Sequence, residues 1–107
     1  MGSLDRLMAQ EIEKEVQGVK LKIKPLAGKE DLKLLAALNP NSKPEELADA
    51  LWKIFEKQMK YNFPEATQEL LEKIPISIFQ EVINATLEAS GINIEEKQEL
   101  LKQFGKG

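Results

Sequence analysis

The chain has 107 residues, of which 42% are apolar and 31% are charged, and its formal net charge is −3. This length and composition suit one domain, residues 1–107, with a hydrophobic core, while the nearly balanced charge argues against general nucleic-acid binding, which needs a basic surface. Because histidine and cysteine are both absent, the sequence excludes imidazole bases, Ser-His-Asp triads, disulfides and thiolate metal sites.

Apolar residues near the N-terminus recur mostly at the spacing of one helical face: Leu4, Leu7, Met8, Ile12 and Val16. This spacing predicts a helix over residues 3–17, begun by Ser3 and ended by Gly18. Residues 1–18 would then form an N-terminal helix that can stand apart from the core. The alternative interpretation makes residues 11–24 a β-hairpin that turns at Gln17 and Gly18.

Residues 19–24, VKLKIK, alternate strictly between apolar and basic side chains. Val19, Leu21 and Ile23 face one way and the lysines face the other, which is the period of a half-buried strand. A single strand leaves its backbone N–H and C=O groups unpaired, so this strand needs either a hairpin partner or another subunit. We therefore expect Val19, Leu21 and Ile23 to form part of a homo-oligomer interface, although edge lysines can also discourage such pairing.

Two helices are predicted in the middle of the chain. Residues 28–38 are expected to form a short helix with three inward side chains, Leu32, Leu35 and Leu38. The strongest helical pattern follows over residues 42–61, where Ser42 and Glu45 form a capping box and Pro44 lies in the first turn. Its apolar stripe consists of Leu47, Ala48, Leu51, Ile54, Phe55 and Met59.

Shorter helices are predicted beyond the break at residues 62–64. One runs over residues 64–73, a second is capped by Ser77, and a third covers residues 93–104. The second helix is expected to bury Phe79, Val82, Ile83 and Leu87. Gly91 should be its left-handed C′ residue, with Ile92 as the accompanying apolar contact. The fold class is therefore mainly α, with about five helices and one short early strand or hairpin.

The charged residues have structural explanations. Glu11, Glu13 and Glu15 alternate along the predicted helix and do not converge on one point, while two glutamate pairs lie in first helical turns, where the helix dipole favours negative charge. We therefore predict a protein that is not an enzyme, with no catalytic residues, no metal site and no cofactor. The lysines among residues 20–33 lack the interleaved aromatic residues of single-strand binding, and we interpret them as a solvated face.

Three side chains on the central helix are the candidate partner-binding residues. Trp52, the only tryptophan, lies at the edge of the apolar stripe, and Phe55 and Met59 follow it at helical spacing. Aromatic residues and methionine are enriched at protein interfaces. Core packing is the plainer interpretation of Phe55.

Residues 19–38 combine an alternating strand that ends in Lys-Pro-Leu with a helix that begins with acidic residues. Residues 74–92, IPISIFQEVINATLEASGI, form a capped helix that ends in a small residue, glycine and isoleucine. In these two stretches the chain resembles the small tail assembly chaperones of long-tailed phages. Members of that family are similar in having an early β element followed by helices, whereas the predicted helix over residues 3–17 departs from their pattern.

The resemblance implies a non-enzymatic role, in which the protein binds the long helical tape-measure protein and tail-tube subunits and keeps them soluble until the tail polymerises. An oligomer joined partly by residues 19–24 would present helical grooves to such a client. A structural virion or helical adaptor protein and a small DNA-binding regulator are the alternatives. Because neither a membrane span nor a signal peptide is recognisable, we expect no membrane partner and a cytoplasmic location, in the host cell if the protein is viral.

Overall fold

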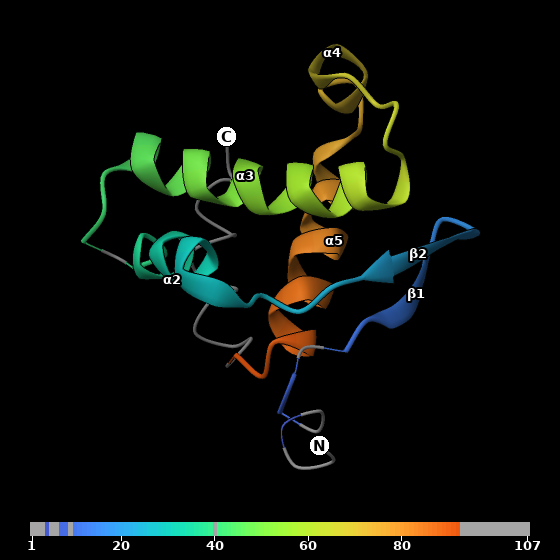
Figure 1. The fold of residues 1–107 in the computed structure, drawn as a ribbon. Helices are drawn as coiled ribbons and strands as arrows, with labels where there is room; N and C mark the ends of the chain where they lie inside the picture. The colour runs from blue at the N-terminus through green and yellow to red at the C-terminus, as the bar shows by residue number, and fades with distance from the viewer. Residues whose placement is uncertain (1–3, 5–6, 9, 40, 93–107) are drawn as a thin grey trace.

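The computed structural model describes residues 4, 7–8, 10–39 and 41–92. Its elements are β1 (Ile12–Val16), β2 (Val19–Ile23), α2 (Gly28–Ala36), α3 (Pro44–Asn62), α4 (Gln68–Leu71) and α5 (Ile76–Ala89). Figure 1 shows α3 crossing α5, with β2 between α3 and β1. The prediction of a mainly α fold with a small β element is confirmed, but the described residues hold four helices where about five were expected. The helix predicted over residues 93–104 lies outside this part of the chain.

The N-terminal elements form a hairpin, so the helix predicted over residues 3–17 is wrong from Ile12 to Val16. β1 pairs antiparallel with β2, in a register that runs from Ile12 opposite Ile23 to Val16 opposite Val19. Gln17 and Gly18 make the turn with φ angles of 53° and 77°, the sign that a two-residue type I′ turn requires at both positions. A spacing of four between Ile12 and Val16 fits a strand face as well as a helical face, which explains the error.

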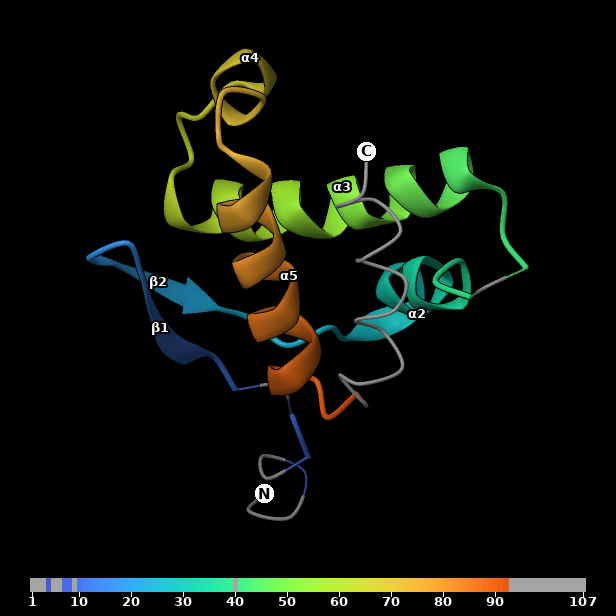
Figure 2. The same cartoon turned by 180° about the vertical axis from the view of Figure 1, so that it is seen from behind.

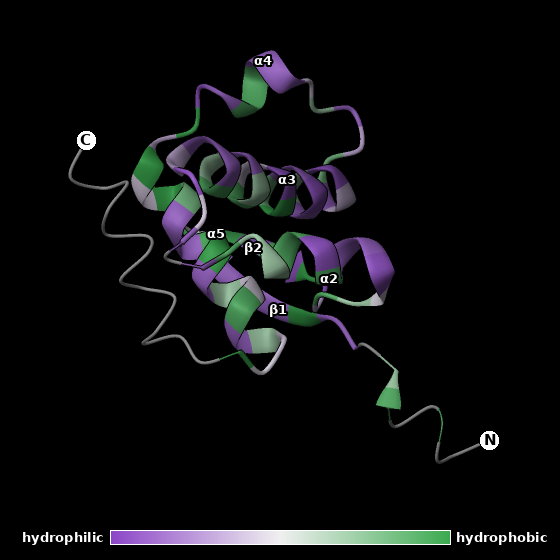
Figure 3. Cartoon of the chain, turned by 90° about the vertical axis from the view of Figure 1, so that its left-hand side faces the viewer, coloured by the Kyte–Doolittle hydropathy of each residue, from purple (hydrophilic) through white to green (hydrophobic). Residues whose placement is uncertain are grey.

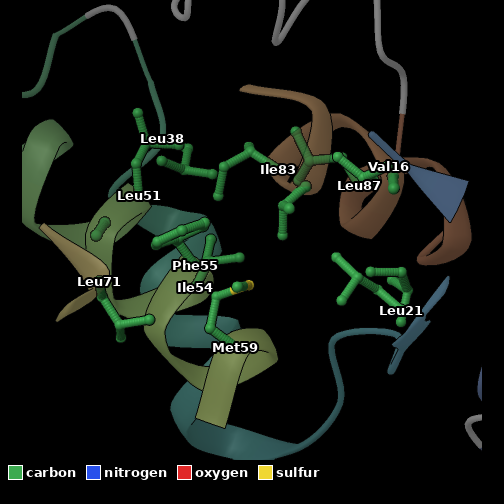
Figure 4. Close-up of a cluster of buried hydrophobic side chains, with 14 of the residues drawn as sticks. Val16, Leu21, Leu38, Leu51, Ile54, Phe55, Met59, Leu71, Ile83 and Leu87 are labelled. Carbon is green, nitrogen blue, oxygen red and sulfur yellow. The ribbon is translucent and has the colours of Figure 1, made fainter. Parts of the chain in front are cut away.

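The core lies where one face of the hairpin meets α3 and α5 (Figure 4). Figure 2 shows α5 in front of α3, which it crosses, and Figure 3 shows apolar residues gathered where the helices and the hairpin meet. The predicted stripe of the central helix is confirmed at Leu47, Leu51, Ile54, Phe55 and Met59. Ala48 is exposed, however, and two other residues of α3 are buried, Ala50 and Gln58.

The inward face predicted for residues 28–38 is confirmed at Leu38, which is buried just beyond the end of α2, and at Leu35, which packs against the core, but it is wrong at Leu32. Leu32 is 65% exposed, whereas Asp31 is only 3% exposed. Both carboxylate oxygens of Asp31 accept from the Lys57 ammonium at 2.7 Å, and one also accepts from the Ala27 N–H at 2.8 Å. This ion pair fixes the start of α2 against α3, because a buried carboxylate needs both a cation and hydrogen bonds.

Two of the predicted helix caps are wrong. Ser42 lies in a turn closed by its N–H bond to the Asn39 carbonyl, so α3 begins after Lys43. The Pro75 carbonyl accepts the first helical bonds of α5, which places Ser77 inside the first turn. The helix predicted from Pro64 is shorter and is capped by Thr67, whose side chain accepts from the Leu70 N–H.

The end of α5 is as predicted. Gly91 has a φ of 75°, its N–H donates to the Glu88 carbonyl at 3.0 Å, and the Ile92 N–H donates to the Leu87 carbonyl at 3.0 Å. These two bonds define a Schellman motif, and Ile92 packs against the core as its apolar contact. Over the residues that the structure describes, no helix has both the length and the hydropathy to cross a membrane.

Candidate protein-binding groove

An apolar groove opens between α3 and the first turns of α5. Its volume is about 440 Å³, within the range of about 300–1,000 Å³ that is typical of ligand pockets. α3 contributes four of the lining residues, and the others come from the chain between α4 and α5 and from the first turns of α5. The lining residues are Ala48, Leu51, Trp52, Phe55, Glu72, Ile74, Ile76, Phe79 and Gln80.

Three aromatic rings form the floor and one side of this groove. The Trp52 and Phe79 rings stack with centroids 6.2 Å apart and an interplanar angle of 15°. Phe55 lies 4.9 Å from Phe79 and 5.4 Å from Trp52, tilted to both. These separations are those of favourable aromatic pairs. Because Phe55 is fully buried, it holds the other two rings in place, and the aromatic wall is formed before any partner arrives.

Apolar residues around Pro75, where α5 begins, also line the groove. Pro75 is the N-cap of α5, with an extended backbone (φ −59°, ψ 151°), and its ring limits the loop to that conformation. Ile74 packs against the core on one side of the proline, while Ile76 on the other side is 62% exposed. The first residue of α5, Ile76, therefore lines the groove with a large branched side chain that is still exposed to solvent.

Two polar residues complete the lining, Glu72 and Gln80. Glu72 is exposed and Gln80 is half-buried, and no lysine or arginine lies among the lining residues. The groove is thus apolar with one negative charge at its rim. A fitting ligand would place apolar side chains inside and a basic group near Glu72.

The predicted partner-binding residues are only partly brought together. Trp52 is half-buried and lines the groove, and Phe55 lies beneath it with no exposed surface. Met59 is 7% exposed and packs in the core without reaching the groove. Binding by these three residues stays a prediction, to which the structure adds Phe79 and Ile76. The sequence holds one signal for Ile76, the apolar run Ile74-Pro75-Ile76 directly before the predicted helix.

The predicted oligomer interface lies largely inside the chain. Leu21 and Ile23 are 3% and 0% exposed in the core, whereas Val19 is 49% exposed beside the turn. The partner that β2 requires is β1 of the same chain. An oligomer formed through these residues stays a prediction.

The lysines of β2 face glutamates of β1 across the hairpin. Glu13 lies opposite Lys22, and Glu15 lies opposite Lys20, so opposite charges are cross-strand neighbours. Glu11 adds an ion pair with Lys22 at 4.0 Å. Among the described residues, no group of three or more acidic side chains could hold a metal ion.

The Tyr61 hydroxyl extends this charged face. It donates a hydrogen bond to the Glu11 carboxylate, and this bond raises the pKa of Tyr61 above its ordinary value, with smaller contributions from burial and from the Glu11 charge. The tyrosine is thus held in its neutral, donating form. It ties the end of α3 to the start of β1.

Comparison with known proteins adds no relative from which a role could be transferred. No protein-family model matches this chain, and neither a curated protein nor a solved structure is significantly similar to it. The groove must therefore be interpreted from its own chemistry.

Proposed function

We propose that the protein is a non-enzymatic binding protein whose Trp52 groove holds an amphipathic helix of a client protein. The observation that carries the proposal is the preformed apolar groove, lined by three aromatic rings and by the exposed Ile76. Recognition of a helix by a groove depends on apolar anchors spaced one turn apart. A groove that is apolar except for Glu72 and Gln80 suits that mode of binding better than it suits a small polar ligand.

The finer proposal concerns the client. The resemblance of residues 19–38 and 74–92 to phage tail assembly chaperones suggests a tape-measure protein, which is long and helical and offers many such anchors. A chaperone of this kind covers apolar surface until assembly, so it needs repeated weak contacts and no chemical site. On this proposal the protein acts in the cytoplasm of the host cell and is absent from the finished particle.

Trp52 provides a direct test, because it is the only tryptophan. The probe is a synthetic helical peptide of eighteen residues, with leucine at three- and four-residue spacing and lysines on the other face. Its binding should remove water from the Trp52 ring and shift the fluorescence emission to shorter wavelength. Because the groove is mostly apolar, the affinity should depend only weakly on salt concentration.

Two matched substitutions locate the binding site. Ile76→Asp and Leu32→Asp each place a carboxylate at an exposed apolar position, with 62% and 65% exposure respectively. Ile76→Asp should weaken peptide binding about tenfold or more, because the charge loses hydration in the groove, and Leu32→Asp should leave the affinity unchanged. Equal affinities of the two variants, or no emission shift with the wild-type protein, would reject the groove as the binding site.

Co-expression tests the client. A tape-measure protein from the same genome should be soluble with the wild-type protein and should aggregate with the Ile76→Asp variant. Detection of the protein at fixed stoichiometry in purified particles would contradict the chaperone proposal and identify a structural virion protein.

A further inference from the structure

The two edges of the hairpin differ in how their backbone groups are satisfied. Along the outer edge of β2, the Lys22 N–H donates to Asn62 Oδ1 at 2.7 Å, and Asn62 Nδ2 donates back to the Lys22 carbonyl at 2.9 Å. Gln58 repeats this exchange with Lys24, with distances of 3.0 Å and 2.6 Å. Two side-chain amides of α3 therefore occupy the positions of a third strand, and this edge is closed at Lys22 and at Lys24, which follows β2.

The outer edge of β1 is open. A two-residue turn makes Val16 and Val19 a hydrogen-bonded pair, and in an antiparallel ladder such pairs alternate along the strands. The backbone groups of Lys14 and Ile12 therefore also face β2, and those of Glu13 and Glu15 face away from it. Among the described residues, none forms a hydrogen bond with the backbone N–H or carbonyl of Glu13 or Glu15. Figure 1 shows β1 on the side of β2 that is turned away from α3.

The charges of this open edge indicate what can pair with it. Glu13 and Glu15 share the outer face of the hairpin with Lys22 and Lys20, which lie directly opposite them. A new strand beside β1 would extend this face, and lysine or arginine opposite the two glutamates would continue the alternation of charge. On the inner face, Ile12 is 43% exposed and would meet an apolar side chain.

A second copy of β1 fits poorly. When two identical strands pair antiparallel about a twofold axis perpendicular to the sheet, directly opposite residues lie on the same face. Glu13 of one copy would then face Glu13 or Glu15 of the other, and like charges directly opposite one another are destabilising. The open edge is therefore selective against its own copy.

We propose that the outer edge of β1 accepts an extended segment of a partner protein as the third strand of the sheet, and that this segment alternates basic and apolar residues. Main-chain hydrogen bonds to Glu13 and Glu15 supply the attachment, and their carboxylates select the basic side chains. This site is separate from the Trp52 groove, since the two share no residue.

The probe for this edge is a fluorescein-labelled hexapeptide of alternating lysine and valine, compared with a hexapeptide of alternating glutamate and valine. Fluorescence anisotropy should give an affinity at least about tenfold higher for the lysine peptide at low salt, with the difference shrinking as salt is added. Amide exchange at Glu13 and Glu15 should slow when the lysine peptide binds. Equal affinities of the two peptides, or unchanged exchange at these amides, would overturn the proposal.

Two variants of one residue separate backbone pairing from charge attraction. Glu15→Thr removes the carboxylate and keeps the N–H, while Glu15→Pro removes both. Because the Glu15 N–H faces away from β2, proline is tolerated there without loss of a hairpin bond, and circular dichroism can verify that the variant is folded. Binding should be weaker for Glu15→Pro than for Glu15→Thr by about fivefold or more.

Three results would overturn the inference. Equal affinity of the two Glu15 variants would show attraction by charge alone. A dimer that light scattering detects in the wild-type protein and not in Glu15→Pro would show that a second copy takes the edge. Loss of hexapeptide binding in Ile76→Asp would place the peptide in the groove, whereas an unchanged affinity in that variant supports a separate site whether or not the groove binds helices.

Discussion

Gln17 adopts a left-handed backbone conformation, with a φ of 53°, at the first central position of the hairpin turn. Its Cβ makes this conformation unfavourable, because L-residues other than asparagine and aspartate seldom adopt it. Gly18 at the second position, with a φ of 77°, carries no such cost. The turn therefore combines one favourable residue with one unfavourable residue.

Replacing Gln17 with asparagine should stabilise the protein. Asn-Gly is the preferred pair for a type I′ turn, and the gain in the free energy of unfolding should be about 0.5–1 kcal/mol. Urea denaturation measures it, with Gln10→Asn as the control because Gln10 is exposed and lies outside the hairpin. A midpoint for Gln17→Asn at or below the wild-type value would contradict this account of the turn.

At the scale of elements, α3 organises the domain through polar as well as apolar side chains. Its apolar stripe packs against α5, its amides Gln58 and Asn62 close the edge of β2, and Lys57 binds the buried Asp31 of α2. Asn62 Nδ2 also donates to the Gln58 carbonyl at 2.8 Å, which orients its amide toward the strand. One helix thus positions the hairpin and the neighbouring helix.

Gln58→Met tests the closed edge. Methionine preserves the volume of the 1% exposed Gln58 side chain but leaves the Lys24 N–H and carbonyl without these partners, so the free energy of unfolding should fall by about 1–3 kcal/mol. Chemical denaturation measures the loss, and faster exchange of the Lys24 amide should accompany it.

Gln68→Met is the control for this substitution, because Gln68 is exposed at the start of α4 and should tolerate the same change. An unfolding free energy for Gln58→Met equal to that of the control would mean that water replaces the amide at no cost.

The limits of sequence-based prediction follow from these same contacts. Apolar periodicity predicted α3, α5 and the Gly91 ending, because each depends on neighbours within a few residues. It did not predict that Asp31 and Gln58 would be buried, since their partners Lys57 and Lys24 lie 26 and 34 residues away. Hydrophobic patterns count every polar residue as surface, and so they miss a core position that is satisfied by a distant hydrogen bond.

The sequence also predicted only part of the candidate groove. Trp52 stood out as a lone aromatic residue at the edge of a helical stripe. Phe79 was assigned to the core, and only the crossing of α3 and α5 brings its ring against Trp52. The hairpin was weighed as an alternative, and its local signals were the Gln17-Gly18 turn and the strict alternation of residues 19–24, a strand that needs a partner.

At the scale of the whole molecule, the part of the chain that is needed for folding begins at β1. The described apolar residues before Glu11 are exposed, with Leu4, Leu7 and Met8 at 66%, 83% and 58%. Val16 on β1, by contrast, is 3% exposed within the core. The residues that are required for a stable fold are therefore expected to begin between Gln10 and Ile12.

Two deletions locate this boundary. Removal of residues 1–10 should change the free energy of unfolding by no more than about 0.5 kcal/mol, because no described side chain there is buried. Removal of residues 1–16 should prevent folding, since β2 loses its ladder and the core loses Val16. Thermal unfolding followed by circular dichroism distinguishes them, and a cooperative transition in the longer deletion would contradict the assignment of β1 to the core.

The amides of Gln58 and Asn62 also have an evolutionary consequence. They bond to backbone groups of residues 22 and 24, which are the same whatever side chains those residues carry. The sequence of the strand can therefore change, whereas the two amide positions of α3 cannot. Asparagine and glutamine are the uncharged side chains that present a donor and an acceptor side by side, on one planar amide, at neutral pH. Distant relatives that have lost detectable identity should therefore retain two amides one turn apart near the end of a long helix that follows a short hairpin, and this stereochemical signature gives a way to recognise them.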